Sequence, residues 1–574
     1  MKRLQGIGAS PGVVRGPWLR IDAVSAPTGG RIEPGDAMRE TQRLHDATVA
    51  ASAELEEIAA RVEGDGHPEE GAIFRAQASI ARDPALVTLA TGRIDDHGED
   101  AVAAVQAAAD SFADQLRSLD DEVLSARAAD VIDVGQRIAR RLSGIPDAAS
   151  ATGLDRPTIV VAADLPPSVT ATLPRERLLG IALEGSSPTA HAAILARAYG
   201  IPAVVGVGDL LDALGPASEI AIDGGTGAVV IDPDTGTAAS IDAATDRDRQ
   251  RHDADLREAG RPAVTSDGVE VALLANIGGP DESESAIELG ADGVGLFRTE
   301  FLFLERSLPP SEEEQAAAYE RVVRAFAPRP VTVRLLDVGG DKAIPYLPIA
   351  PEANPFLGVR ALRLADVERG LFVTQLRACY RAATAGRLKV MAPMVADAGD
   401  VDLLHELAEQ ARRELAAESI PIGAVNLGVM LEIPSSVLVS DAYFGRIGFA
   451  SLGTNDLLQY TVAVDRTNPR LERYRDPLHP AVLRLVRMAV DAGDRAGIEI
   501  SVCGEMAGDP VSALALVGLG VRSLSMAASG LPAVRRAIRG AHHRQLSAVM
   551  RKALGEGSAA PARARLGELV AATP

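Results

Sequence analysis

One histidine lies in a setting that could carry a phosphoryl group. His191 follows a turn rich in glycine and serine and precedes residues 192–199, whose composition predicts a short helix that Gly200 would end. The first turn of a helix offers free backbone N–H groups and a partial positive charge, and both favour a bound phosphate. Neutral imidazole is a nucleophile near neutral pH. Taken alone, this stretch is explained equally well by a surface histidine at the start of a helix.

A second set of polar residues follows apolar segments in the C-terminal half. Its members are Arg298, Glu300, Arg334, Asp337, Glu432, Asp456, Arg466, Cys503 and Glu505. The carboxylates of Glu432 and Asp456 could hold one Mg²⁺, which favours few protein oxygens and leaves room for substrate oxygens and water. The three arginines could bind a phosphate and a carboxylate in forked geometry. Each residue alone has a structural explanation, as an ion pair or as core packing, so the hypothesis depends on the set.

Eight short apolar segments, which alternate with amphipathic stretches, must position this set. They are residues 269–277, 293–298, 332–337, 389–395, 427–432, 449–454, 499–503 and 523–527. Eight strands that alternate with helices predict a (β/α)8 barrel, whose active site lies at the carboxyl ends of the strands. A doubly wound open sheet is the alternative, but no Gly-x-Gly-x-x-Gly turn follows the first strand.

The N-terminal half predicts an α/β unit with a helical insert. Residues 1–20 alternate loosely and contain a turn at 10–12, and further short strands are expected at 158–161, 179–183, 202–207, 220–222 and 228–231. Between these parts, residues 34–143 repeat apolar residues at helical spacing. This insert is either a structural bundle or a docking surface. The charged segment 238–260 indicates a solvated helix between two domains.

Composition excludes several classes of protein. The 574 residues suggest three to four domains, and the formal net charge of −21 argues against nucleic acid or an anionic membrane as the main partner. Such a surface would suit a basic protein partner. The two cysteines, Cys379 and Cys503, imply no disulfide framework, so we expect a cytoplasmic protein. No apolar run is long enough to span a membrane, and the first residues lack the apolar core of a signal peptide.

In chain order, the motifs resemble those of the Enzyme I family, the phosphoenolpyruvate–protein phosphotransferases of the phosphoenolpyruvate:sugar phosphotransferase system. They are Ala9-Ser-Pro-Gly12, Arg127-Ala-Ala-Asp-Val131, Thr189-Ala-His191, Gly293-Val-Gly-Leu-Phe-Arg-Thr-Glu300, Asp337-Val-Gly-Gly-Asp-Lys342, Asn354-Pro-Phe-Leu-Gly358, Gly453-Thr-Asn-Asp-Leu-Leu-Gln-Tyr460 and Cys503-Gly-Glu505. The barrel motifs are shared with pyruvate phosphate dikinase and phosphoenolpyruvate synthase, which need an ATP-binding domain. Here the helical insert is similar in position to the surface on which Enzyme I docks the phosphocarrier HPr.

The resemblance implies a role for each residue of the site. His191 would take the phosphoryl group of phosphoenolpyruvate on Nε2, with release of pyruvate, and pass it to a histidine of HPr as the first step of sugar uptake. Glu432 and Asp456 would bind Mg²⁺, and Cys503 would protonate the enolpyruvate at its methylene carbon. Phosphoenolpyruvate itself would be held by Arg298, Arg334, Asn455 and Arg466.

The resemblance also implies an organisation in four parts. A swivelling phosphohistidine α/β domain would comprise residues 1–33 and 144–235, and the HPr-docking insert would comprise 34–143. A helical linker would follow at 236–262, and the phosphoenolpyruvate-binding barrel at 263–574. Because one histidine must face the barrel and then HPr, we expect the linker region to act as a hinge. Dimerisation through the barrel is implied as well.

Two motifs depart from the family pattern. The family often has Gly-Gly-x-Thr-Ser-His, whereas this chain has Ser186-Ser-Pro-Thr-Ala-His191, which bears on the orientation of the imidazole. Gln77 stands where the family often has a histidine after Ile-Phe-x-Ala, so we expect the HPr contacts to differ. No sensory domain precedes these motifs, which favours the sugar-system form over the nitrogen-related form.

Two other classes of function compete with the transferase. A Mg²⁺-dependent lyase acting on an oxo-acid would use Glu432, Asp456 and an arginine but would not need His191. A non-catalytic scaffold would bind a partner through its helices and would not need the residues at the strand ends. Labelled phosphoenolpyruvate separates the first alternative from the transferase, because only the transferase would acquire an acid-labile label on His191.

Overall fold

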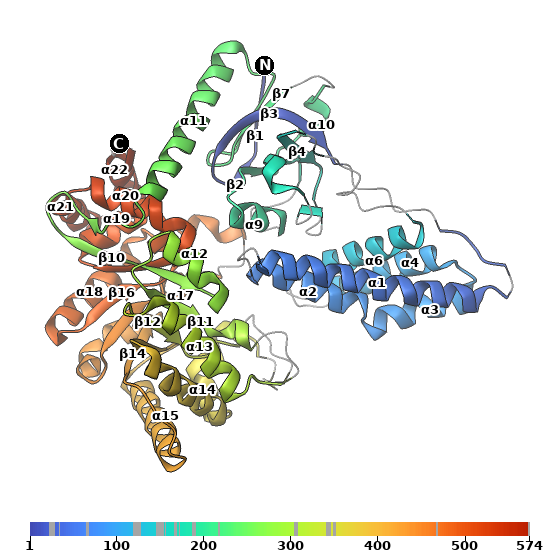
Figure 1. The fold of residues 1–574 in the computed structure, drawn as a ribbon. Helices are drawn as coiled ribbons and strands as arrows, with labels where there is room; N and C mark the ends of the chain where they lie inside the picture. Colours follow the sequence, from blue (N-terminus) through green and yellow to red (C-terminus); the bar gives the residue numbers. More distant parts are fainter. Residues whose placement is uncertain are drawn as a thin grey trace. The chain divides into compact units, whose positions relative to one another are not determined.

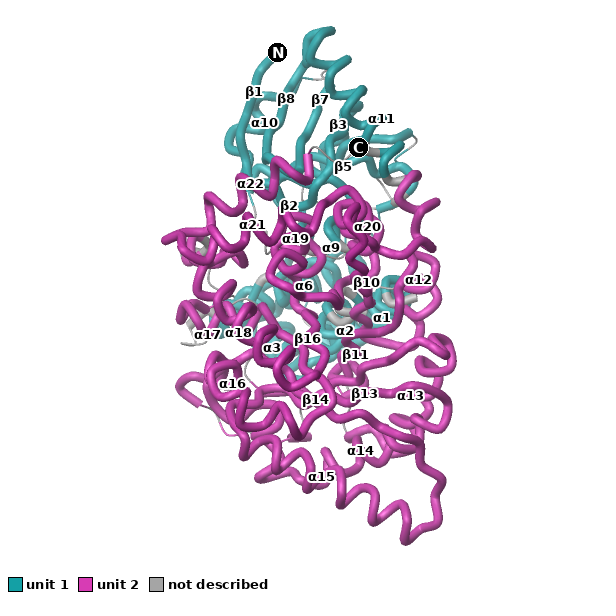
Figure 2. Tube along the Cα trace, turned by 90° about the vertical axis from the view of Figure 1, so that its left-hand side faces the viewer, with its two compact units in different colours: residues 1–251 teal, residues 252–574 magenta. Residues whose placement is uncertain are grey.

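The computed structural model divides the chain into two compact units, residues 1–251 and 252–574 (Figure 2). It describes residues 1–21, 29–33, 35–64, 68–118, 128–144, 154, 156–165, 169–170, 173–185, 191–215, 219–303, 308–339, 346–347, 350, 352–465 and 469–571. Within these ranges, no helix combines the length and the apolar character needed to cross a bilayer.

The second unit contains a closed barrel of eight parallel strands. They are β10 (Glu270–Ile277), β11 (Val294–Arg298), β12 (Val331–Arg334), β13 (Leu388–Ala392), β14 (Val425–Leu431), β15 (Phe449–Leu452), β16 (Glu499–Val502) and β17 (Ser523–Ala527). Strand β10 pairs with both β11 and β17, and this pairing closes the barrel. The prediction of a (β/α)8 barrel is therefore confirmed, and the open doubly wound sheet is wrong. The short strand β9 (Ala263–Val264) adds to β10 in antiparallel fashion.

Helices follow the barrel strands in the order that a (β/α)8 fold requires. They are α12 (Ser283–Glu288), α13 (Glu312–Phe326), α14 (Arg369–Ala382), α15 (Ala398–Ala417), α16 (Pro434–Leu438), α17 (Thr454–Val462), α18 (Pro480–Ala496), α19 (Pro510–Leu519), α20 (Leu531–Gly540), α21 (His543–Ala553) and α22 (Ala560–Ala571). All four residues of β12 are buried, although the last of them is an arginine. A strand covered on both faces is mostly apolar, so a buried charge at its end needs partners.

The first unit contains a mixed eight-stranded sheet. Its strands are β1 (Lys2–Gln5), β2 (Ile7–Ser10), β3 (Val13–Arg20), β4 (Thr158–Ala162), β5 (Leu178–Leu183), β6 (Ala203–Val205), β7 (Glu219–Asp223) and β8 (Ala228–Ile231). The order β1-β8-β7-β3-β4-β5-β6-β2 confirms that residues 1–20 complete the sheet. They form three strands, and Gly12, at φ 126°, turns the chain between the second and the third.

The predicted helical insert is confirmed as a bundle with a core of its own. It comprises α1 (Ala37–Gly64), α2 (Pro68–Ala81), α3 (Pro84–His97), α4 (Ala101–Ser118) and α6 (Ala128–Leu142), which lie alongside one another in Figure 1. The short helices α9 (His191–Ala198) and α10 (Leu210–Ala213) belong to the α/β part. Leu195 of α9 is buried in the core of the bundle, so the helix that begins at His191 is anchored on the insert.

Helix α11 (Thr235–Arg257) runs from the first unit into the second. In the first unit, Thr245 Oγ1 donates a hydrogen bond to the Val13 carbonyl at 2.7 Å, and Asp242 pairs with Arg15 at 2.7 Å. In the second unit, Asp255 pairs with Arg536. The side chains described between 246 and 254 are exposed, as expected for the predicted solvated helix.

We expect Leu195→Ala to destabilise the first unit by about 2–5 kcal/mol, because it leaves a cavity where α9 joins the helical core. The only tryptophan, Trp18, lies in β3, so its fluorescence during urea unfolding reports on this unit. Met38→Ala is the matched control, since Met38 is 86% exposed and its truncation should change stability by less than about 0.5 kcal/mol. Equal shifts in both variants would show that Leu195 does not anchor α9.

Candidate active site at the mouth of the barrel

The predicted barrel residues meet at the carboxyl ends of the strands. Arg298 and Arg334 are the last residues of β11 and β12, Glu432 follows β14, and Cys503 follows β16. Asn455 and Asp456 lie in the first turn of α17, directly after β15. Parallel strands carry their ends to the same rim of the barrel. The structure therefore brings these six residues together as predicted.

The two arginines lie side by side in the sheet. Arg298 and Arg334 are register partners on neighbouring parallel strands, an arrangement in which like charges repel. The guanidinium of Arg334 is buried, contacts Glu300 and lies 3.2 Å from Asp337 Oδ2. Burial opposes its charge, but these two carboxylates outweigh burial and raise the pKa of Arg334. The pair suits an anion with several acceptor oxygens.

Arg360 is a member of the site that the sequence did not reveal. Its Nε lies 2.9 Å from Asp337 Oδ1, and its Nη1 lies 3.2 Å from Asp456 Oδ1. It is buried, and the carboxylates of Asp337 and Asp456 overcome that burial and raise its pKa. In the sequence, Arg360 is marked only by its place two residues after the motif at 354–358. That place does not predict that the chain returns to the rim of the barrel.

Glu432 is buried in a setting that disfavours its charge. Its Oε1 accepts the N–H of Met394 at 2.6 Å, and Met394 has a φ of 57°. Burial, together with the nearby carboxylates of Asp456 and Asp337, raises the pKa of Glu432 to about 8. At Gly453 a Cβ would lie 3.0 Å from Glu432 Oε2, so the glycine leaves room for the carboxyl group. Without a cation, this carboxyl keeps its proton near neutral pH.

Cys503 is suited to hold a proton rather than to act as a thiolate. It lies in a small apolar layer with Leu296, Met391, Met430 and Phe449. Burial raises the pKa of the thiol to about 11. Asn276 donates a hydrogen bond from Nδ2 to the carbonyl of Cys503 at 3.0 Å. A buried, protonated thiol beside two arginines can act as a general acid.

The remaining predicted residues fall in three places. His191 is the first residue of α9, as predicted, and belongs to the first unit. Arg466 and Thr189 lie outside the described residues. Gln77 is fully buried inside the helical bundle, where its Nε2 donates to Asp130 Oδ1 at 3.0 Å. Any effect of Gln77 on a docking surface is therefore indirect.

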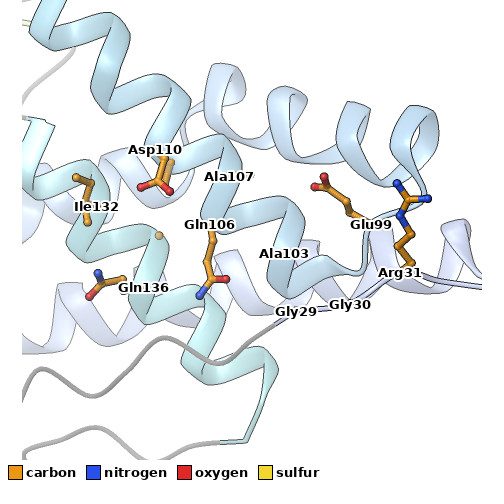
Figure 3. A pocket seen from close by; sticks show the side chains of 12 residues that line it. Gly29, Gly30, Arg31, Glu99, Ala103, Gln106, Ala107, Asp110, Ile132 and Gln136 are labelled. Atoms are coloured by element: carbon orange, nitrogen blue, oxygen red, sulfur yellow. The ribbon is translucent and has the colours of Figure 1, made fainter.

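A pocket of about 670 Å³ lies apart from these residues, in the helical insert (Figure 3). It opens between α4, α6 and residues 29–31, with Arg31 and Glu99 at one end and Asp110 and Gln136 at the other. No predicted site residue lines it.

We expect Glu432→Gln to stabilise the metal-free protein by roughly 1–3 kcal/mol at pH 8, because the amide removes a buried charge. The pKa of Glu432 rises from 4.5 to about 8 on folding, so its stabilising contribution is present below pH 4.5 and is lost as the pH rises through 8. The gain should therefore be larger at pH 8 than at pH 6. Urea unfolding with a chelator, followed by circular dichroism, measures it. The same pH dependence in both proteins would contradict the prediction.

Comparisons with known proteins agree with this geometry. Three family models match in chain order: the N-terminal domain of PEP-utilising enzymes at residues 5–127, their mobile domain at 154–227 and their PEP-binding domain at 252–543. The phosphoenolpyruvate-protein phosphotransferase of Bacillus subtilis is 36% identical over 94% of this chain and 94% of its own length.

Two longer relatives are called multiphosphoryl transfer proteins. The one from Rhodobacter capsulatus is 40% identical over 98% of this chain, and the one from Xanthomonas campestris pv. campestris is 39% identical over 96%. This chain spans 67% and 64% of their lengths. Since the family models and the full-length relatives match the same parts in the same order, the chain belongs to the phosphoenolpyruvate–protein phosphotransferase family of PEP-utilising enzymes.

Proposed function

We propose that the chain transfers the phosphoryl group of phosphoenolpyruvate to His191, releases pyruvate, and passes the group to a histidine of HPr. One observation carries the proposal: two arginines in strand register end at the same rim of the barrel as the buried carboxyls of Glu432 and Asp456. Such a site suits a small dianion or trianion with phosphate and carboxylate groups. The name of the Bacillus subtilis relative states the same donor and a protein acceptor.

In this proposal, the positive groups bind and orient the donor. Arg298, Arg334, Asn455 and Arg466 hold the phosphate and the carboxylate of phosphoenolpyruvate. Phosphoryl transfer needs positioning and charge neutralisation more than covalent help from the protein. Asn455 is already oriented, because its Oδ1 accepts the N–H of Glu505 at 3.1 Å. Glu300 and Asp337 already hold the guanidinium of Arg334, so this side chain loses little conformational entropy when phosphoenolpyruvate binds.

The residues at the rim fit a Mg²⁺ ion. Within the described ranges, no group of three or more histidine, cysteine, aspartate or glutamate side chains forms a metal site by itself. Mg²⁺ is commonly held by one or two carboxylates together with substrate phosphates, which Glu432 and Asp456 would provide. The buried Thr454 Oγ1, which has no hydrogen-bond partner, lies two residues before Asp456 in the chain. When bound, the ion would neutralise charge on the donor and ionise Glu432.

Cys503 completes the reaction in this proposal. As the phosphorus–oxygen bond breaks and the phosphorus–nitrogen bond to His191 forms, the electron pair of the broken bond stays with enolpyruvate. The Cys503 thiol then gives its proton to the methylene carbon, which becomes the methyl group of pyruvate. The raised pKa of this thiol ensures that it still carries its proton at neutral pH.

The other parts of the chain have roles in the same proposal. The α/β domain (1–33 and 144–235) carries His191, the insert (34–143) docks HPr, the linker (236–262) is the hinge, and the barrel (263–574) binds phosphoenolpyruvate and dimerises. The net charge of −21 suits a basic docking partner. Both cysteines are free and buried, which is consistent with work in the cytoplasm.

We expect ³²P-labelled phosphoenolpyruvate with Mg²⁺ to label the protein on His191. The label should be acid-labile, as a phosphoramidate is, and His191→Ala should abolish it. His97→Ala is a suitable control, because His97 ends α3 and has no place in the proposal. A protein that acquires no label from phosphoenolpyruvate with Mg²⁺ would contradict the transferase proposal and leave the lyase that acts on an oxo-acid as the alternative.

We expect Cys503→Ala to lower the rate of pyruvate formation by roughly 10²–10⁴, the usual contribution of a general acid. Binding of phosphoenolpyruvate should change little, because the arginines remain. Coupled assay of pyruvate measures the rate. Cys379→Ala is the control, since Cys379 is fully buried in the shell of the barrel on α14. A similar rate in both variants would remove Cys503 from the mechanism.

A further inference from the structure

We propose that Gln375 is a positioning residue that fixes the spacing of Arg298 and Arg334. This inference rests on the proposed function, because it assigns to Gln375 a part in binding phosphoenolpyruvate. Gln375 lies on α14 and is fully buried, so it does not touch the substrate. Its effect would pass through the backbone of the two strand ends.

The side-chain amide of Gln375 joins the ends of β11 and β12. Its Oε1 accepts the N–H of Leu336 at 2.8 Å, and its Nε2 donates to Thr299 Oγ1 at 2.9 Å. Thr299 Oγ1 in turn donates to the carbonyl of Arg334 at 2.8 Å. The Gln375 carboxamide therefore binds the Leu336 N–H directly and reaches the Arg334 carbonyl through Thr299 Oγ1.

Four charged residues of the site lie next to these contacts in the chain. Thr299 stands between Arg298 and Glu300, and Leu336 stands between Leu335, which follows Arg334, and Asp337. β12 ends at Arg334. Beyond this point the N–H of Leu336 donates to the side chain of Gln375. The amide thus acts at the point where regular strand pairing ends and the functional side chains begin.

Hydrogen bonds to Tyr319, which continue to Gln315, keep the Gln375 amide in one orientation. The second N–H of Gln375 donates to the hydroxyl of Tyr319 at 3.1 Å, and that hydroxyl donates to Gln315 Oε1 at 3.2 Å. Gln315 Nε2 donates to the carbonyl of Pro310 at 3.0 Å. Both donors of Gln375 are therefore used. A flip of the amide would place an N–H against the N–H of Leu336, a buried conflict that strongly disfavours it.

The physical need for such a clamp comes from the two arginines. They are register partners at the last residues of β11 and β12, where regular strand pairing ends, so the backbone after each strand sets the distance between them. A forked contact with phosphate requires guanidinium groups held within about 0.5 Å of their binding positions. The Gln375 amide fixes the distance between the two strand ends without approaching the ligand.

The test compares Gln375→Met with Gln315→Met. Both substitutions replace a buried amide with an apolar side chain of similar length in the same network, but Gln315 contacts neither strand end. We expect both to lower the melting temperature. Only Gln375→Met should raise KM for phosphoenolpyruvate, by about tenfold, with kcat lowered less than about threefold because the reacting groups remain. A folded Gln375→Met protein whose KM equals that of the unsubstituted protein would overturn the proposal.

A second variant covers the case in which Gln375→Met does not fold. Thr299→Val removes the hydroxyl between Gln375 and Arg334 while keeping the shape of the side chain, and it should raise KM about fivefold. An unchanged KM in a folded Thr299→Val protein would also overturn the proposal.

Direct titration with phosphoenolpyruvate, followed by calorimetry, separates this inference from the proposed function. If the unsubstituted protein binds and is labelled, while Gln375→Met binds equally well, only the Gln375 proposal is wrong. If the unsubstituted protein neither binds phosphoenolpyruvate nor is labelled, the proposed function is wrong and this inference falls with it.

Discussion

The site depends on one electrostatic constraint, which is the placement of two arginines in register at the ends of β11 and β12. Neighbouring like charges in a sheet repel, and Arg334 is also buried, so neither position is favourable for folding alone. The structure offsets this cost with carboxylates. Glu300 and Asp337 contact Arg334, and Arg360 extends the network from Asp337 to Asp456. The rim of the barrel is therefore a connected set of charges rather than a group of separate ion pairs.

Inside the barrel, an apolar layer lies apart from the charged residues of the rim. Cys503 lies among Leu296, Met391, Met430 and Phe449, and burial there keeps its proton in place. Glu432 lies near the charged layer, yet it is so deeply buried that its own ionisation is unfavourable without a cation. Two ionisable groups of the site thus hold protons near neutral pH for the same reason, which is the cost of an unpaired buried charge.

The division into two units places His191, the proposed acceptor, in a different unit from this charge network. His191 begins α9, and Leu195 of that helix is buried in the core of the helical bundle. The barrel supplies the arginines, the carboxyls and the thiol. Helix α11 joins the units with one ion pair in each unit and with exposed side chains at the described positions from 246 to 254. In the proposed function, phosphoenolpyruvate therefore binds to one unit and the histidine that accepts the phosphoryl group belongs to the other. This arrangement suits a phosphoryl group that is passed on to a second protein.

The sequence by itself determined the elements and the rim. Short apolar segments at regular intervals predicted all eight barrel strands, because a parallel strand covered on both faces must be apolar. Since parallel strands end at one rim, the polar residues after them had to meet there, and so Arg298, Arg334, Glu432, Asp456 and Cys503 could be found without coordinates. The helical spacing of apolar residues likewise predicted the insert, and the motif order indicated the family.

Only the tertiary structure decided which residues complete the site. Arg360 and Gln375 lie outside the strands, on a loop and on a helix, where neither spacing nor residue type indicates a direction. Their contacts with Asp337, Asp456, Leu336 and Thr299 depend on how the chain returns to the rim after β12. Burial decided the protonation of Glu432 and Cys503 as well, because a pKa depends on the surrounding dielectric and charges rather than on neighbours in the chain.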